Sequence, residues 1–151
     1  MEPVPSHFLL VDDDDDHAEL VIQGMKRGRV CNTLDRVRDG VEAMDYLYQR
    51  GPYASKPRPD VVLLDLNMPR MGGHEVIEKV RGDPRLCFIP IVVLTTSDAD
   101  GDRTRSYELH ANSYLVKPIN FQEFTKMAQE LSLYWGVWNR PPLRAADTDC
   151  R

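Results

Sequence analysis

Four short apolar runs, each ending in a polar residue, constrain the fold of this chain more than any other feature. The runs span residues 8–11, 61–64, 91–94 and 114–116, and the polar residues that follow them are Asp12, Asp65, Thr95 and Lys117. Continuous Val/Ile/Leu runs of this length are typical of strands buried on both faces, as in parallel sheets covered by helices. A weaker run at residues 33–38 adds a fifth expected strand.

Between these runs lie five segments with a helical pattern of apolar residues. We expect helices at residues 16–27, after Gly40, around residues 76–80, from Asp98 and from Asn120. Five strands alternating with five helices predict an α/β fold, a doubly wound five-stranded parallel sheet with helices on both faces. We choose the flavodoxin-like strand order 2-1-3-4-5, in which the first and third strands are neighbours and the carboxylates that follow them meet in one crevice.

Five consecutive aspartates, residues 12–16, follow the first apolar run. Carboxylates packed so closely raise one another's pKa unless a cation or hydrogen-bond donors keep them ionised, which favours a functional site. The alternative is a solvated helix entrance, because aspartate suits the N-cap and the positive end of the helix dipole. We expect Asp14 to cap the first helix and Asp15 and Asp16 to face solvent.

Length and composition indicate one domain. We expect an N-terminal extension at residues 1–6, the domain at residues 7–138, and a partly disordered tail at residues 139–151. The net charge of -5 and the absence of a basic stripe argue against nucleic-acid binding. No apolar stretch approaches the roughly 20 residues that span a bilayer, and no signal-peptide core follows the N-terminus. We therefore expect a cytoplasmic protein, whose odd number of cysteines without metal-ligand spacing suits reduced thiols.

The polar residues at the strand ends resemble the signature of a known family. Asp12 and Asp13, Asp65 in VVLLDLNMP, Thr95 in VVLTTS and Lys117 before proline are similar to the five signature positions of two-component response regulator receiver domains. The resemblance covers about residues 8–131. The GPYASKPRPD insertion, LTTS, SYELHANSYLVKP and the aromatic LYWGVWNRPP are similar to the small single-domain regulators of bacterial and cyanobacterial phytochromes.

The resemblance implies a role for each site residue, and phosphoryl transfer needs the same parts: a nucleophile, Mg²⁺ and a cation or hydroxyl donor. Asp65 is the phosphoacceptor. Thr95 donates its hydroxyl, and Lys117 places an ammonium near the phosphate. The expected metal residues are Asp12, Asp13, Asp65 and the backbone carbonyl of Asn67, with Asp12 holding a metal-bound water. Pro118 suggests a cis peptide after Lys117.

Further residues have expected roles in the response. Tyr114 matches the receiver aromatic that changes rotamer as the threonine moves, so Thr95 and Tyr114 form the expected switch. Asn67 and Ser97 match positions that tune hydrolysis of the phosphoaspartate. We expect the four histidines, His7, His17, His74 and His110, to be structural.

The expected function is a stand-alone response regulator rather than an enzyme. A sensor histidine kinase, of the phytochrome type, donates the phosphoryl group to Asp65, and the product either binds a target directly or passes phosphate to a histidine phosphotransfer protein. The alternative is a small-molecule phosphohydrolase of the haloacid-dehalogenase type. That enzyme needs a general acid where Asn67 stands, and its acidic pair follows the nucleophile rather than preceding it.

The C-terminal helix carries a long apolar stripe. Its residues are Phe121, Phe124, Ala128, Leu131, Trp135 and Trp138. A helix over residues 120–138 would be about 28 Å long, more than a domain of this size usually covers. We expect a homodimer that buries Leu131, Trp135 and Trp138, together with the fourth helix and fifth strand. In the alternative, the chain breaks at Gly136 and folds Trp138 back on its own subunit.

Overall fold

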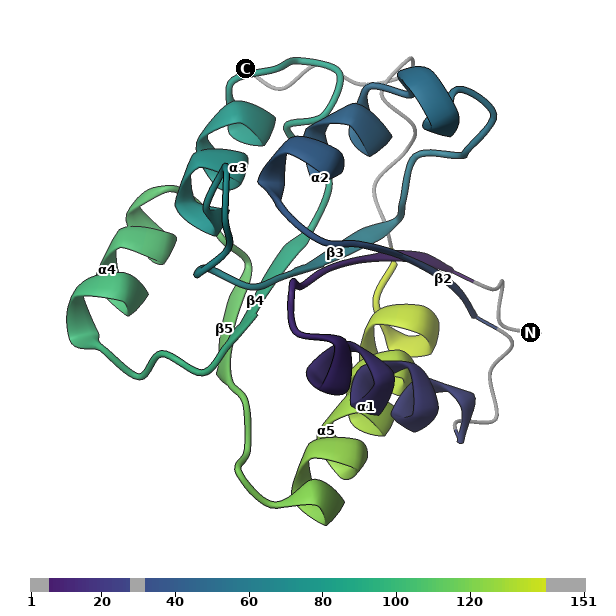
Figure 1. Ribbon diagram of the computed structural model, residues 1–151, viewed down its shortest axis with the longest axis vertical. Coiled ribbons are helices and arrows are strands. Elements are labelled where there is room, and N and C mark those ends of the chain that lie inside the picture. The colour runs from purple at the N-terminus through teal and green to yellow at the C-terminus, as the bar shows by residue number, and fades with distance from the viewer. Residues whose placement is uncertain (1–5, 28–31, 141–151) are drawn as a thin grey trace.

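Five parallel strands form the centre of the molecule (Figure 1), in a computed structural model that describes residues 6–27 and 32–140. The strands are β1 His7–Val11, β2 Thr33–Val37, β3 Val61–Leu64, β4 Ile91–Thr95 and β5 Ser113–Val116. Their order is β2-β1-β3-β4-β5, and every pairing is parallel. The predicted fold class and strand order are confirmed.

Helices cover both faces of this sheet. They are α1 Asp15–Lys26, α2 Gly40–Leu47, α3 Gly73–Arg81, α4 Asp100–Glu108 and α5 Phe121–Leu133. A short 3₁₀ helix, η1 Gly51–Tyr53, lies within the Pro-rich insertion. In Figure 1, α1 and α5 lie together on one face, and α2, α3 and α4 lie on the other.

The alternation of side chains along each strand divides the core into two layers. Leu9 and Val11 point into the layer under α2 and α3, whereas Phe8 and Leu10 point toward α1 and α5. All four are at most 1% exposed, as expected of a central strand covered on both faces. The α1 and α5 helices approach closely at Gly24, where an added Cβ would meet Ala128 and the carbonyl of Thr125.

Side-chain caps set where three of the helices begin. The Asp14 carboxylate accepts a hydrogen bond from the His17 amide at 3.0 Å, which confirms Asp14 as the cap of α1. Asp39 caps α2 in the same way, and Asn120 caps α5. These caps satisfy amides that have no partner inside the helix.

The C-terminal helix ends differently from the prediction. Its regular part stops at Leu133, and a π-helical turn, η2 Tyr134–Trp138, continues it. Leu131 and Trp135 are only 6% and 9% exposed and belong to the core layer between α1, α5 and the sheet, whereas Trp138 is 71% exposed. The prediction that Trp135 needs a second subunit to cover it is therefore wrong, because the subunit's own core covers it; Leu131, predicted both for that core and for the dimer interface, lies in the core.

The predictions about thiols, membrane spans and domain limits have different outcomes. Cys87 is half-buried and disulfide-bonded, so the prediction of reduced thiols is wrong at this residue. Within the described residues, no helix is long and apolar enough to cross a membrane. The proposed domain limits and the cytoplasmic location remain predictions, and the tail beyond Arg140 lies outside the described residues.

Candidate functional site

Three carboxylates meet at the carboxyl edge of the sheet. Because Val11 of β1 is paired with Leu64 of β3, the residues that follow these strands lie next to each other. Oxygen atoms of Asp12, Asp13 and Asp65 lie within 4.8 Å of one another. Asp12 and Asp65 are buried, and Asp13 is exposed, so the cluster opens to solvent on one side. The predicted meeting of these residues is confirmed.

A buried ammonium group lies against the cluster. Nζ of Lys117, which follows β5, donates to Asp12 Oδ2 at 2.6 Å and to Asp65 Oδ2 at 3.1 Å. The Lys117 and Asp12 side chains are each only 1% exposed. A buried charge is costly unless it is paired, so the lysine and the two carboxylates stabilise one another in this interior.

The two buried carboxylates also accept hydrogen bonds from the backbone. Asp12 Oδ1 accepts from the Asp14 amide at 2.9 Å, and Asp65 Oδ1 accepts from the Leu66 amide at 2.7 Å. Burial raises the pKa of Asp12 above its ordinary value, and the hydrogen bond from Lys117 opposes that rise. The desolvated Asp12 carboxylate therefore needs a nearby cation to stay ionised.

A second polar group links the end of β4 to α4. Thr95 is fully buried; its Oγ1 accepts from the Ser97 amide at 3.3 Å, and its carbonyl accepts from the Lys117 amide at 2.7 Å. Ser97 Oγ donates to Asp102 Oδ2 at 2.5 Å, and the Tyr114 hydroxyl donates to the Ser97 carbonyl at 2.9 Å. Thr95, Ser97 and Tyr114 are thus connected, but the Ser97 side chain is directed to α4.

Two further predictions about the site concern Asn67 and the peptide bond between Lys117 and Pro118. Asn67 is exposed, two residues beyond Asp65, and the role of its carbonyl remains a prediction. The peptide bond between Lys117 and Pro118 is trans, since the described residues contain no cis peptide, and the prediction of a cis bond is wrong. Lys117 reaches both carboxylates from a trans bond, which X–Pro sequences favour by about 0.5–1 kcal/mol.

Sequence reasoning missed two contributors to this edge. The first is His17, whose Nδ1 lies 3.1 Å from the Lys117 ammonium although the two residues are 100 positions apart. The second is Arg36 of β2, which donates to the Asp12 carbonyl at 2.8 and 3.0 Å and to Asp15 at 2.7 Å. Asp15 is thus exposed yet paired. In the sequence, Arg36 was recognisable only as a positively charged residue in the strand expected next to the one that ends at the acid run.

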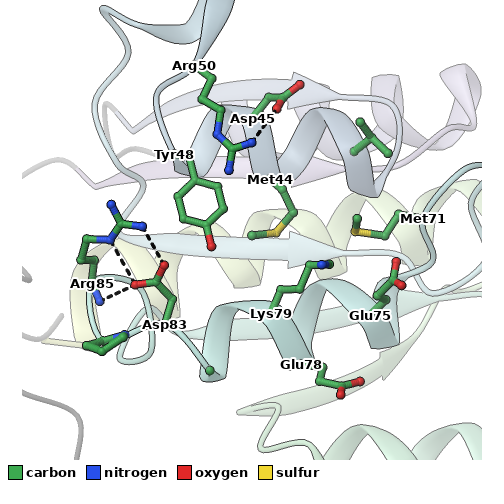
Figure 2. Close-up of a pocket in the computed structure, with 13 residues that line it drawn as sticks. Met44, Asp45, Tyr48, Arg50, Met71, Glu75, Glu78, Lys79, Asp83 and Arg85 are labelled. Atoms are coloured by element: carbon green, nitrogen blue, oxygen red, sulfur yellow. Dashed lines mark hydrogen bonds and ion pairs between the residues drawn. The ribbon is translucent and has the colours of Figure 1, made fainter.

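The described residues also form a groove between α2 and α3, separate from the acid cluster (Figure 2). It has a volume of about 880 Å³, and Met44 and Met71 line it. At one end, the Arg50 guanidinium lies 4.3 Å from the centre of the Tyr48 ring, and Arg85 pairs with Asp83 at 2.9 Å. No residue of the acid cluster lines this groove. Arg50 also lies 3.8 Å from Asp45, so two ion pairs line the groove.

Comparison with known proteins decides the family. The model of the response regulator receiver domain matches residues 8–129. The chain belongs to the response regulator receiver family. Its fold and its cluster of acidic residues beside a lysine are those the sequence resemblance implied.

Relatives of similar length refine this assignment. The chain is 42% identical to the response regulator Rcp1 of Synechocystis over 131 residues, which cover 87% of this chain and 89% of Rcp1. It is also 42% identical over 139 residues to the probable methanogenesis regulatory protein FilR2 of Methanothrix harundinacea, covering 91% of this chain and 88% of FilR2. Both relatives are close to this chain in length.

A solved structure agrees with these relatives. The phosphorylated cyanobacterial phytochrome response regulator RcpA superimposes with a TM-score of 0.88 at 36% identity, covering 93% of this chain and all of RcpA. The similarity extends well beyond the limits of the family model. The phosphohydrolase alternative finds no support in any of these matches.

Proposed function

We propose that this protein is a response regulator that accepts a phosphoryl group on Asp65 from a sensor histidine kinase. The observation that carries the proposal is the group of Asp12, Asp13 and Asp65 around the Lys117 ammonium at the carboxyl edge of the sheet. In an open α/β sheet this edge, at the switch point between β1 and β3, is where ligands bind. Family membership supports the same function.

In the proposed reaction, an Asp65 carboxylate oxygen attacks the phosphorus of the kinase phosphohistidine. A P–O bond forms, the P–N bond breaks, and the imidazole leaves with the bonding electron pair. Oδ1 of Asp65 is held by the Leu66 amide and Oδ2 by Lys117, so the carboxylate is oriented before the donor arrives. The Lys117 ammonium and the Thr95 hydroxyl then interact with the phosphoryl oxygens.

The three carboxylates suit Mg²⁺, because this hard cation prefers oxygen ligands and is held in proteins by one or two carboxylates besides waters. We propose Asp13, Asp65 and the Asn67 carbonyl as direct ligands, with Asp12 holding a metal-bound water. When bound, Mg²⁺ supplies charge neutralisation at the phosphoryl oxygens. One structure of the relative Rcp1 is a Mn²⁺-bound form, which supports a divalent cation here.

The proposed output starts at Thr95 and Tyr114. Movement of Thr95 toward the phosphoryl group would alter its bond to Ser97, and both the Tyr114 hydroxyl and Asp102 of α4 are attached to Ser97. Phosphorylation therefore changes the face formed by α4 and β5. We propose that this face binds a target or that the protein passes phosphate to a histidine phosphotransfer protein, and that Asn67 and Ser97 tune phosphoaspartate hydrolysis.

The proposed kinase is of the phytochrome type, because RcpA and a bacteriophytochrome response regulator are among the similar structures. A phosphotransfer profile against the histidine kinases of the source organism tests this pairing. A phytochrome kinase should label the protein faster than the other kinases do. Faster labelling by an unrelated kinase would contradict the pairing while leaving Asp65 as the acceptor.

The acceptor itself is tested by substitution. Asp65→Asn should abolish both Mg²⁺-dependent binding of beryllofluoride and covalent phosphorylation, because an amide nitrogen is a poor nucleophile and ligand. Asp16→Asn is the matched control, since Asp16 is an exposed acid of the same run outside the cluster. Undiminished phosphorylation of the Asp65 variant would refute the site.

We also propose a homodimer, in a form revised from the sequence prediction. The exposed large apolar side chains of the described residues all lie between residues 107 and 138, in α4, β5, α5, η2 and the segments between them. They are Tyr107, Val116, Ile119, Phe121, Leu133, Tyr134 and Trp138. Exposed large apolar side chains suit an interface, and a second copy of the chain would cover them.

Sedimentation velocity tests this proposal. We expect a dimer at tens of micromolar that Trp138→Ala weakens without changing the thermal stability of the domain. A monomer in this range, with and without beryllofluoride, would refute the homodimer.

A further inference from the structure

We propose that His17 is a positioning residue for Lys117, holding the ammonium in the site while the carboxylates around it change partners. This inference rests on the proposed phosphoryl transfer to Asp65. Sequence analysis treated His17 as a structural residue of α1, and its contact with Lys117 gives it a specific role.

The Lys117 ammonium has three acceptors for its three N–H groups. Asp12 Oδ2 lies at 2.6 Å, Asp65 Oδ2 at 3.1 Å and His17 Nδ1 at 3.1 Å. An ammonium can only donate hydrogen bonds. His17 Nδ1 can therefore accept this hydrogen bond in the tautomer that has its proton on Nε2, and the same atom lies 3.5 Å from Asp14 Oδ2.

The position of His17 is determined by two neighbouring elements. Its amide donates to the capping carboxylate of Asp14 at 3.0 Å, which places the residue in the first turn of α1. Its ring packs against Phe124 of α5, with 5.7 Å between ring centres and 36° between ring planes. The imidazole is thus held between α1 and α5, with Nδ1 directed at the ammonium.

His17 differs from the other two acceptors in what happens to it during the reaction. Asp65 becomes the phosphorylated group, and Asp12 belongs to the carboxylate cluster that suits a divalent cation. Both carboxylates therefore exchange their interactions with Lys117 when the phosphoryl group arrives. The imidazole takes no part in that exchange, so its Nδ1 remains as an acceptor while the ammonium turns toward a phosphoryl oxygen.

Two variants of similar size separate the acceptor from the packing. His17→Leu keeps an apolar contact for Phe124 but has no acceptor, whereas His17→Asn offers an oxygen close to the position of Nδ1. In the full chain with Mg²⁺, we expect His17→Leu to weaken beryllofluoride binding by about tenfold, since it removes an acceptor from a charged hydrogen-bond donor. His17→Asn should stay within about threefold of the unsubstituted protein, and Mg²⁺ affinity within about twofold for both variants.

The outcomes distinguish this inference from its alternatives. Equal affinity of all three proteins for beryllofluoride would overturn it, and an equal loss in both variants would show that the ring only packs. Failure of the unsubstituted protein to bind beryllofluoride would instead refute the proposed function. Nitrogen-15 NMR of the unsubstituted protein decides the case independently of how the variants fold: we expect an unprotonated Nδ1 at His17, and a proton on that atom would overturn the inference.

Discussion

The carboxyl edge of the sheet and the C-terminal end of α5 both bury a side chain that sequence analysis picked out, but for opposite physical reasons. At the sheet edge, Lys117 is buried among carboxylates that balance its charge. At the end of α5, Trp135 is buried among apolar residues of the same subunit. Burying the Lys117 charge costs free energy, which its pairing with the carboxylates offsets, whereas burying the Trp135 ring stabilises the fold.

The two cases show which sequence patterns can be interpreted without knowing the distant neighbours of a residue. A polar residue directly after a buried strand has little freedom, because the strand brings it to the sheet edge. An apolar stripe on a helix shows that something must cover it, but the stripe is the same whether the cover is the subunit's own sheet or a second copy of the chain. Four measurements test this contrast between the two regions.

The largest expected effect is on stability at the C-terminal end. Trp135→Ala should lower the free energy of unfolding by about 3–5 kcal/mol, because it removes a large buried side chain and leaves a cavity. Trp138→Ala, the matched control, should change it by less than about 0.5 kcal/mol, since this side chain is 71% exposed. Urea denaturation of both variants measures the difference. Equal effects would mean that Trp135 is not part of the core.

At the sheet edge, Lys117→Ala should weaken the binding of beryllofluoride rather than the binding of Mg²⁺. We expect beryllofluoride affinity to fall by roughly 30-fold to 100-fold, since the ammonium is a charged hydrogen-bond donor to the bound anion. Mg²⁺ affinity should be retained or rise, because a positive charge beside the carboxylates is removed. Lys79→Ala, in the groove between α2 and α3, is the control. Equal loss of both ligands would mean that Lys117 is structural.

A smaller effect on stability is expected at Gly136. An added Cβ there would meet the side chain of Asn32, which accepts from the Ser6 amide at 3.0 Å and donates to Ser132 Oγ at 3.0 Å. Gly136→Ala should therefore cost about 1–2 kcal/mol through these disturbed bonds. Gly101→Ala in α4 is the control, since an added Cβ meets nothing within 4 Å there and alanine favours a helix. Thermal unfolding should separate the two variants.

The smallest expected effect is a pH dependence of Mg²⁺ binding. Burial raises the folded-state pKa of Asp12 above its ordinary value, so in the folded, metal-free protein Asp12 becomes protonated at a higher pH than a free aspartate does. The contribution of Asp12 to folding is therefore unfavourable above that raised pKa and is relieved as the pH falls through it. Since a protonated carboxyl is a poor metal partner, Mg²⁺ affinity should fall in the same window, by at most about tenfold per pH unit.

Calorimetric titrations from pH 7 downward measure this effect. Asp12→Asn should flatten the decline, because an amide does not titrate in this range. An unchanged decline in that variant would assign the pH dependence to Asp13 or Asp65 instead.

The strand order was a choice among doubly wound sheets. The amino-acid sequence alone predicted the five strands, the meeting of Asp12, Asp13 and Asp65, and the capping role of Asp14. These follow from apolar periodicity, from covalent adjacency to strand ends and from the local preference of aspartate for helix starts, none of which needs knowledge of distant neighbours.

Three features could be seen only in the folded molecule: Trp135 packs inside its own subunit, Lys117 is followed by a trans peptide bond, and His17 faces the Lys117 ammonium. Each of these depends on how segments far apart in the chain approach one another and on which rotamers that approach permits. The pattern of residues along the chain predicts helices and strands from their periods, but it does not predict the distance between the first turn of α1 and the end of β5.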